Sequence, residues 1–275
     1  YKLYKYNNLS KDVKIFDNND DYTINKLYKF DDNNIIISYS KVIGYTTRNY
    51  IALLDCKDNS ISPFKFHEES HEEKIEYISK INNEFLVTGD DDGYVCLWNF
   101  IEKSFIKKIR PCDQMYDLIT INDEIIAIAT DNYILLYNII NETSEKRFFG
   151  LHSRKIFKLI NLRSRCIISA GYDGDVYLTD ITSDPIDPWI FKLYCSKSNF
   201  VRDINKIGEF VIITRLDFVI ELLFMPSKDH FKHYTFDNKN TKITSIMDFD
   251  GKQFLTGDKY GKLKLWDLNL NINKN

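Results

Sequence analysis

The stretch LVTGDDDGYVCLWN, residues 86–99, recurs in related form as IISAGYDGDVYLTD at 167–180 and as FLTGDKYGKLKLWD at 254–267. Each copy ends in a closing pair, such as Trp98-Asn99, and a hydroxyl residue stands ten positions before the first residue of that pair, as Thr88 does before Trp98. In the first two copies a histidine stands 27 positions before that closing residue, as His71 does before Trp98. Agreement at separate offsets identifies an internal repeat, and a repeat decides the fold before any single residue does.

Weaker copies lie between the strong ones. The closing pairs are separated by 44, 39, 42, 44 and 43 residues, and they are Leu54-Asp55, Trp98-Asn99, Tyr137-Asn138, Thr179-Asp180, Leu223-Phe224 and Trp266-Asp267. This spacing matches the ~40–45 residues of a four-stranded propeller blade. Residues Lys2–Asn7 and Asp12–Phe16 predict the third and outer strands of one more blade, whose first two strands would lie upstream of Tyr1. We therefore predict seven blades with the first partial; the alternative is six blades closed by the N-terminal strand.

Strand composition predicts an all-β chain. Runs such as Tyr94–Trp98 and Phe218–Leu223 are short, rich in β-branched or aromatic residues, and apolar at consecutive positions. A strand covered on one side only would alternate between apolar and polar residues. Radially stacked blades bury both faces of their inner strands, which accounts for these runs. The uninterrupted repeat predicts that residues 1–275 form a single domain.

The repeated phrase resembles the WD40 repeat, and the resemblance covers essentially the whole chain. It implies a β-propeller and a buried chain of hydrogen bonds that links tryptophan, hydroxyl, histidine and turn aspartate. The residues implied are His71, Thr88, Asp92 and Trp98 in the first strong copy, His152, Ser169 and Asp173 in the second, and Thr256 and Trp266 in the last. Donor and acceptor types suit such a chain, because indole only donates, hydroxyl and imidazole relay, and carboxylate only accepts. The copies depart from the family pattern at Thr179, where tryptophan is usual, and at Tyr260, where aspartate is usual.

Composition indicates an intracellular protein of the nucleus, nucleolus or cytoplasm. The net charge of −3 gives no sign of a surface that binds polyanions, so contact with RNA is expected only indirectly, within a complex. Five scattered cysteines without a CxxC pair suit reduced thiols better than a disulfide framework. No apolar run approaches the ~20 residues of a membrane helix, so we expect no membrane contact. The chain opens on Tyr1, which suggests a piece trimmed from a slightly longer chain.

Several patterns resemble sites of chemistry, yet we predict no catalytic, cofactor or metal site. His67-Glu-Glu-Ser-His71 matches HExxH, but that zinc motif needs a helix, and this segment is a short connection before a strand. His230 and His233 lie three apart in a predicted strand, so their side chains diverge. Residues Asp90–Gly93 lack the downstream glutamate of a calcium loop. No small-molecule substrate is expected, because neither a Gly-rich phosphate loop nor a GxSxG elbow occurs.

Function is therefore expected on the surface, where propellers of this kind dock proteins. The candidate partner-binding residues follow each repeat histidine by two positions or precede each turn aspartate by one; they are Glu73, Arg154, Asp91 and Tyr172, with Lys259 at the corresponding place in the last repeat. Arg154 and Tyr172 are of the residue types enriched at interface hot spots. Arg202, with Arg163, Arg165 and Arg215, would add a positive sector for an acidic or phosphorylated partner.

The sequence is most consistent with a non-catalytic scaffold in a multi-subunit protein complex. Residues 71–99 are similar to the third repeat of a nucleolar WD-repeat subfamily acting in ribosome biogenesis. Open alternatives are a ubiquitin-ligase substrate receptor and a vesicle or nuclear-pore component. From another class, the chain is similar to the WD-repeat methylesterase of diphthamide synthesis, although no nucleophile–base pair can be picked out.

Overall fold

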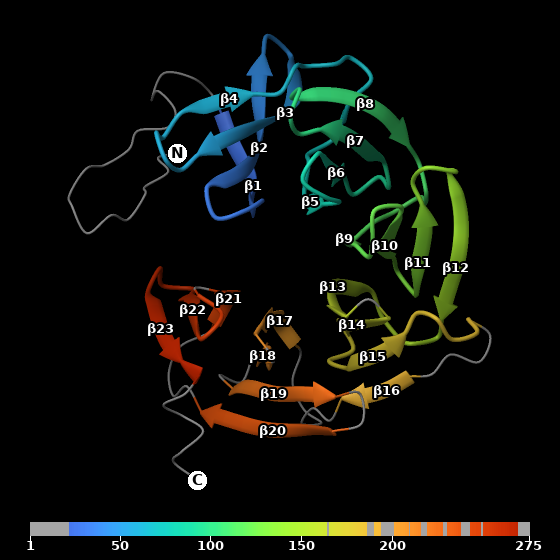
Figure 1. The fold of residues 1–275 in the computed structure, drawn as a ribbon, viewed down its shortest axis with the longest axis vertical. Coiled ribbons are helices and arrows are strands. Elements are labelled where there is room, and N and C mark those ends of the chain that lie inside the picture. The colour runs from blue at the N-terminus through green and yellow to red at the C-terminus, as the bar shows by residue number, and fades with distance from the viewer. Residues whose placement is uncertain are drawn as a thin grey trace. The chain divides into compact units, whose positions relative to one another are not determined.

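The structure is a computed structural model that describes residues 22–163, 165–185, 190–193, 201–208, 210–215, 219–227, 230–237, 243–248 and 250–268. Within these ranges only the backbone is described for residues 163, 191, 193, 219 and 221–237. The described elements are 23 β-strands (Figure 1). The chain divides into two compact units, one of residues 1–130 and 135–146 and the other of residues 131–134 and 147–275. That residues 1–275 form a single domain remains a prediction.

The first unit is built from antiparallel four-stranded sheets in which consecutive strands are neighbours. One sheet has the order β1 (Tyr22–Lys29), β2 (Asn34–Ile43), β3 (Thr46–Asp55), β4 (Ile61–Pro63), and the next has β5 (Tyr77–Lys80), β6 (Phe85–Gly89), β7 (Val95–Asn99), β8 (Ser104–Ile109). The third has β9 (Asp117–Thr120), β10 (Ile125–Ala129), β11 (Tyr133–Asn138) and β12 (Thr143–Phe149), and part of β11 and β12 belongs to the second unit.

The second unit repeats the same meander. Its sheets are β13 (Ile156–Arg163), β14 (Cys166–Gly171), β15 (Val176–Asp180), β16 (Ile190–Leu193); then β17 (Val201–Ile207), β18 (Phe210–Arg215), β19 (Val219–Ser227), β20 (His230–Asp237); and a three-stranded sheet of β21 (Ile243–Asp248), β22 (Gln253–Asp258), β23 (Leu263–Asp267).

Each of the six predicted repeats thus corresponds to one sheet, and the all-β prediction is confirmed. The residues that predict a further blade, Lys2–Asn7 and Asp12–Phe16, lie outside the described ranges. The number of blades therefore stays a prediction.

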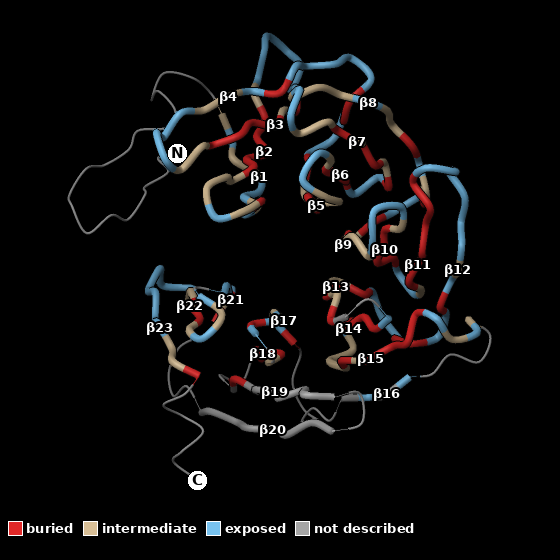
Figure 2. The backbone as a smooth tube through the Cα atoms, viewed as in Figure 1, coloured by how far each residue is buried: buried red, intermediate tan, exposed pale blue. Residues whose placement is uncertain are grey.

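Burial explains why the strand sequences are apolar at consecutive positions. Ile126, Ala127, Ile128 and Ala129 of β10 follow one another and are all fully buried. Successive strand residues point to opposite faces, so this strand is covered on both sides. In Figure 2 the buried residues likewise run along the middle strands of the described sheets, whereas exposed residues gather in the connections.

Apolar contact between neighbouring sheets forms the core of each unit. In the first unit one cluster joins Ile36 and Leu53 of the first sheet to Leu86 and Trp98 of the second. In the second unit another cluster joins Ile168 and Leu178 to Ile204 and Val211 in the same manner, and a third links β17–β20 to β21–β23. In this kind of stacking each sheet contacts only its neighbours, so each repeat must supply one apolar layer. The regular spacing of the repeats places such a layer in every sheet.

Candidate functional site

The three strong copies fold into the same tight turn between the second and third strands of their sheets. Gly93, Gly174 and Gly261 occupy equivalent positions and have φ values of 78°, 86° and 79°. Glycine adopts this left-handed backbone without the steric cost that a Cβ atom imposes. Each turn is closed by one backbone hydrogen bond across its base, donated by the amides of Asp90, Gly171 and Asp258 to the carbonyls of Tyr94, Asp175 and Lys262 at 3.1, 3.2 and 3.0 Å.

Four buried side chains form a hydrogen-bonded chain in the β5–β8 sheet. Trp98 Nε1 donates to Thr88 Oγ1 over 2.8 Å, and Thr88 Oγ1 lies 2.7 Å from Nε2 of His71. Nδ1 of His71 lies 2.6 Å from Oδ2 of Asp90. Because the Thr88 hydroxyl accepts from the indole, its own proton is available to His71 Nε2, which leaves Nδ1–H to donate to the Asp90 carboxylate.

The carboxylate that ends this chain is Asp90, and the assignment to Asp92 is wrong. Asp92 is exposed at the apex of the turn, whereas Asp90 is buried at its base. Asp90 directly follows β6, where its Oδ1 also accepts the amide of Tyr94 over 3.0 Å. The side chain at the base of the turn points toward His71, and the one at the apex projects into solvent.

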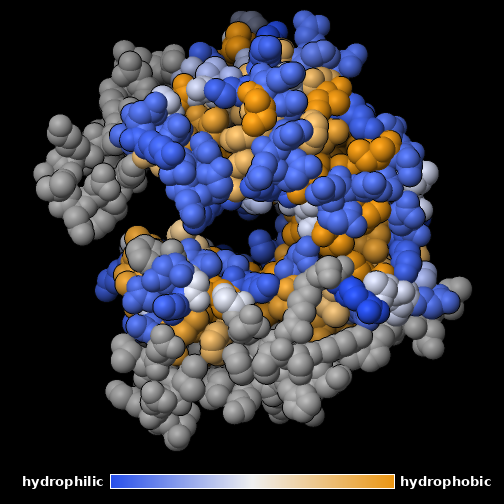
Figure 3. Space-filling view, in the orientation of Figure 1, coloured by the Kyte–Doolittle hydropathy of each residue, from blue (hydrophilic) through white to orange (hydrophobic). Residues whose placement is uncertain are grey.

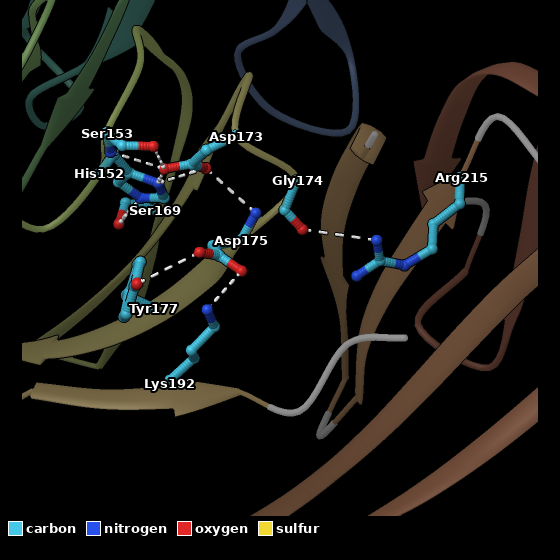
Figure 4. A network of polar contacts seen from close by, with 9 residues as sticks. All are labelled: His152, Ser153, Ser169, Asp173, Gly174, Asp175, Tyr177, Lys192 and Arg215. Carbon is cyan, nitrogen blue, oxygen red and sulfur yellow. Dashed lines mark hydrogen bonds and ion pairs between the residues drawn. The ribbon is translucent and has the colours of Figure 1, made fainter. Parts of the chain in front are cut away.

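The β13–β16 sheet has a related chain with its acid two positions later (Figure 4). Nε2 of His152 lies 2.9 Å from Ser169 Oγ, and Nδ1 lies 3.0 and 3.2 Å from the two carboxylate oxygens of Asp173. The position equivalent to Asp90 is Gly171, where a Cβ atom would lie 2.3 Å from His152 Nδ1. The ring of His152 therefore occupies the space that a side chain would need there, and the acid comes from the apex.

The other end of the second chain lacks the indole donor. Thr179 stands at the position of Trp98, and its Oγ1 is buried without a hydrogen-bond partner among the described residues. In the last sheet Trp266 Nε1 donates to Thr256 Oγ1 over 2.9 Å, and Asp258 accepts the amides of Tyr260 and Lys262. Asp258 thus stands where Asp90 does, without a histidine beside it among the residues with described side chains.

Burial sets the charge of the second chain. It lowers the pKa of His152 from its ordinary value, and the hydrogen bond with Asp173 opposes this shift without cancelling it. For Asp173 burial favours a higher pKa, but hydrogen bonds from His152 and from the amides of Asp175 and Ser153 outweigh it and leave the pKa lowered. We infer a neutral imidazole that donates through Nδ1–H to an ionised carboxylate.

The order acid, histidine, hydroxyl resembles a hydrolase triad, but neither chain can act as one. Ser169 and Thr88 are fully buried, and both histidines are nearly so. A nucleophile must reach the substrate carbonyl, and here protein atoms surround each hydroxyl. These chains are internal parts of the fold, and their contribution to stability is taken up in the Discussion.

The predicted partner-binding residues of the first unit are exposed beside the turn after β6. Asp91 is exposed, and its Oδ1 accepts the hydroxyl of Tyr77 over 2.8 Å. Glu73 is exposed in the connection between β4 and β5. Both are acidic, whereas the candidates of the second unit described below are basic or aromatic.

In the second unit Arg154 and Tyr172 stand on adjoining segments. The amide of Tyr172 donates to the carbonyl of Lys155, the neighbour of Arg154, over 2.9 Å. Tyr172 is 49% exposed, and its ring packs on Phe157 with the centroids 5.0 Å apart. Arg154 is exposed, as are Arg202 at the start of β17 and Lys259, whose Nζ lies over the Tyr260 ring.

The four arginines do not form one positive sector. Arg215 is only 1% exposed; its Nη1 donates to the carbonyl of Gly174 over 3.4 Å, as Figure 4 shows. Arg165 lies between β13 and β14, at the opposite end of that sheet from Tyr172, and its Nη2 donates to Thr182 Oγ1. Only the backbone of Arg163 is described. Arg215 stands eight residues before Leu223, as Asp90 stands eight residues before Trp98. This equivalence within the repeat is the one feature of the sequence that indicates burial of Arg215.

The remaining histidine motifs lie in the connection before β5 and in β20. His67 and His71 lie in the connection between β4 and β5, and His71 is held by Thr88 and Asp90. No three histidine, cysteine or acidic side chains gather as metal ligands in the part of the chain that is described. His230 and His233 lie on β20, of which only the backbone is described. Cys56, Cys96, Cys112 and Cys166 are free thiols, and Cys195 lies outside the described ranges. Among the described residues no helix is long and apolar enough to cross a membrane.

Known sequences match parts of this chain. The family model "WD domain, G-beta repeat" matches residues 67–99 and 231–267. WD repeat-containing protein 55 homologues of Drosophila erecta and Drosophila yakuba are each 30% identical over 78 residues, which is 27% of this chain and 16% of theirs. The TSET complex member tstF of Dictyostelium discoideum is 34% identical over 90 residues, 27% of this chain and 8% of that protein. The matched part is thus a small fraction of each relative.

Solved structures match the fold over nearly the whole chain. The C-terminal WD40 domain of Sif2 aligns with a TM-score of 0.67 and 16% identity, covering 90% of this chain and 68% of that one. The computationally designed Ika8 protein aligns with a TM-score of 0.65 and 17% identity, covering 89% and 70%. At these identities the likeness concerns the fold alone.

Proposed function

Because this chain is a WD40-repeat protein with the β-propeller fold, we propose that it is a non-catalytic scaffold that holds other proteins within a complex. Its docking residues are proposed to be those of the turns and connections at one edge of the sheets. Arg154 and Tyr172 are the main contacts in the second unit. Lys259, at the repeat position of Tyr172, and Arg202, at the start of β17, are further candidates. Asp91 and Glu73 are the corresponding contacts in the first unit.

One observation supports this proposal above the others: Tyr172 is a large exposed ring on a rigid support. The turn that carries it is closed by the amide of Gly171, its backbone is bonded to Lys155, and its ring rests on Phe157. A tyrosine fixed in this way loses little freedom when a partner covers it. The exposed Arg154 beside it supplies the charge that a nearby acidic or phosphorylated residue of the partner would meet.

The burial of both histidine chains supports a scaffold over a hydrolase such as the diphthamide-pathway methylesterase. A histidine beside a hydroxyl is the arrangement that esterase chemistry would use, yet Ser169 and Thr88 have no exposed surface. Substrate could approach them only after a sheet had opened, which would dismantle the fold.

For the complex itself we propose ribosome biogenesis in the nucleus or nucleolus. The likeness of residues 71–99 to a nucleolar WD-repeat subfamily of ribosome biogenesis and the matches to WD repeat-containing protein 55 homologues support this. The match to a TSET complex member favours a second candidate, a subunit of a TSET-like complex in the cytoplasm.

Affinity purification of the tagged protein followed by mass spectrometry tests both levels of the proposal. Recovery of pre-ribosomal particles supports ribosome biogenesis, recovery of TSET-type subunits supports the second candidate, and recovery of elongation factor alone supports the methylesterase. Arg154→Glu combined with Tyr172→Ala should lose the partners, whereas Arg165→Glu, at the other end of the same sheet, should keep them. If both variants recover the partners equally well, Arg154 and Tyr172 do not form the docking site.

A further inference from the structure

The turn between β2 and β3 is longer than its equivalents in other sheets. In four sheets the last strand pair before this turn is Gly89–Val95, Ala170–Val176, Thr214–Ile220 or Gly257–Leu263, and each pair encloses five residues. Aligned by the closing pairs Leu54-Asp55 and Trp98-Asn99, the equivalent pair of the first sheet is Ser38–Ile51, which encloses twelve. The first sheet thus carries seven additional residues at this turn.

The additional residues are ordered as a hairpin, which we call the hairpin arm (residues 39–50). Strand pairing continues from Tyr39–Tyr50 to Ile43–Thr46, and Gly44 and Tyr45 form the two-residue turn. Gly44 has a φ of 63°, the left-handed value that tight hairpin turns require at their first position. In Figure 1 the loop that joins β2 to β3 stands at the top of the picture, and in Figure 2 it is coloured as exposed.

The base of the hairpin arm is fixed on both faces. On one face the rings of Tyr22, Tyr39, Tyr50 and Phe66 follow one another with centroid distances of 5.5, 5.3 and 5.2 Å. On the other face Ser40 Oγ donates to Asn49 Oδ1 over 2.7 Å, and Asn49 Nδ2 donates to the carbonyl of Glu72 over 2.8 Å. A projecting two-stranded hairpin is marginally stable alone, and this support holds it in one direction.

The tip of the arm is apolar and contributes nothing to the core. Val42 is 53% exposed, Ile43 is 42% exposed, and the side chain of Tyr45 is fully exposed. In the space-filling view, apolar residues reach the surface among hydrophilic ones over the sheets at the top of the picture (Figure 3). Large apolar side chains exposed on an ordered projection are typical of a segment that another protein covers. Insertions in repeat proteins likewise often lie on the binding face.

The charges of the arm indicate the chemistry of the partner. Lys41 and Arg48 stand directly opposite each other in the strand ladder, and the sequence contains no acidic residue between Asp32 and Asp55. Lys41 Nζ lies 4.7 Å from the centre of the Tyr22 ring, and the Arg48 guanidinium lies 5.1 Å from that of Phe66, so both cations are held in place. The exposed Arg48 guanidinium is thus positioned to meet a carboxylate of a partner.

We propose that the hairpin arm is a docking element for an acidic segment of another protein, whose apolar side chains cover Val42, Ile43 and Tyr45. Two cations next to the apolar tip of the arm suit a peptide better than a nucleic acid, which would demand more positive charge. The proposal concerns the first unit and needs no residue of the Arg154–Tyr172 edge, so each can fail without the other.

The test uses the full chain in the cells that produce it, with the photo-cross-linking residue benzoylphenylalanine in place of Tyr45. The expected product joins residue 45 to a segment of another protein that has acidic residues within a few positions of the cross-link. Arg48→Glu should lower the yield about tenfold or more, because it places like charges against each other in the contact. Reversing the acidic residue of the partner to arginine should restore it.

Two matched controls accompany the test. The same cross-linker at Ile101, which is 65% exposed in the first unit, should not capture this partner, and Lys57→Glu, a charge reversal at another exposed lysine of that unit, should leave the yield unchanged. The melting temperature of Arg48→Glu should match the parent. A cross-link confined to this chain, to a second copy, to nucleic acid or to a segment without acidic residues would overturn the proposal, as would a yield that Arg48→Glu leaves unaltered.

Discussion

Nδ1 of His71 lies 2.6 Å from Oδ2 of Asp90, and the exposed fractions of the two side chains are 0% and 1%. Asp90 is therefore the acid whose loss should matter. Asp90→Ala leaves His71 Nδ1 and the Tyr94 amide without their acceptor in a buried site, which should cost about 1–3 kcal/mol of unfolding free energy. Asp92→Ala changes an exposed apex and should stay within about 0.5 kcal/mol. Urea unfolding of both variants checks this, and the reverse ranking would contradict the assignment.

Removing His71 itself tests whether the chain supports the fold. His71→Ala leaves the Thr88 hydroxyl and the Asp90 carboxylate without their shared partner, which should cost about 1–3 kcal/mol. His67→Ala, a few positions earlier on the exposed connection, is the matched control and should unfold at nearly the parent urea concentration. A melting curve of His71→Ala that coincides with that of the parent would remove this chain from the stabilising interactions.

Thr88 and Thr179 should respond in opposite ways to the same substitution. Thr88→Val removes the atom that joins Trp98 Nε1 to His71 Nε2, so two buried groups lose their partner, at a cost of about 1–3 kcal/mol. Thr179 Oγ1 is buried without a hydrogen-bond partner among the described residues. Thr179→Val keeps the shape of the side chain and removes that polar atom, so stability should be unchanged or higher by up to about 1 kcal/mol. Thermal melts of the two variants decide the matter, and equal destabilisation would argue against it.

Stability should fall as the solution becomes mildly acidic, because burial lowers the pKa of His152. In the unfolded chain histidine binds its proton near pH ~6.5. Below that pH the unfolded state binds a proton that the folded state does not, so the unfolding free energy decreases until the pH reaches the folded pKa of His152. The pKa of Asp173 is also lowered, so its protonation belongs to more acidic solutions.

Urea midpoints of the parent and of His152→Asn, measured between about pH 7.5 and 5.5, isolate this contribution. The variant lacks the titrating ring and should lose less stability across that range than the parent does. Parallel losses in the two proteins would assign the pH dependence to other groups.

Gly171 and Gly89 should differ as sites for alanine. A Cβ atom at Gly171 would lie 2.3 Å from His152 Nδ1, and the ring is held on both sides by Ser169 and Asp173. At Gly89 the nearest atom is Sδ of Met115 at 2.8 Å, at the end of a flexible side chain. Gly171→Ala should therefore cost about 1–3 kcal/mol or more through overpacking, and Gly89→Ala distinctly less. Comparison of the two melting temperatures tests this, and a smaller loss at Gly171 would contradict the packing argument.

The sequence was sufficient for the sheets because the period is a property of neighbouring strands. Fixed spacing places a hydroxyl residue, a turn glycine and a closing residue at the same points of the three strong copies, so their strands and turns follow from counting. The Thr88–Trp98 contact was implied by the resemblance to the WD40 repeat. The choice between Asp90 and Asp92 could not follow in this way. Both acids belong to one turn, and which of them reaches His71 depends on whether a side chain fits at the base of the turn, as the contrast with Gly171 shows.

Two other features depend on contacts that the sequence does not display. Arg215 reads as a surface charge, yet its Nη1 reaches the carbonyl of Gly174, a residue of the preceding sheet 41 positions earlier in the chain. The hairpin arm adds seven residues, but the interval from Leu54-Asp55 to Trp98-Asn99 does not reveal it, because the arm precedes the first closing pair. An insertion such as the hairpin arm, which lies before the first closing pair, can be located only when the pairing of the strands is known.

The five-residue turns have a consequence for how such a protein can diverge. In the three turns that contain Gly93, Gly174 and Gly261, the base is set by backbone hydrogen bonds and that glycine. The other turn residues, such as Asp91, Tyr172 and Lys259, can therefore be exchanged during evolution while the sheet remains the same. An ancestral set of duplicated repeats could in this way acquire new partners one turn at a time. Its descendants would then retain recognisable sequence only in short segments, whereas their backbones would continue to superpose along almost the entire chain.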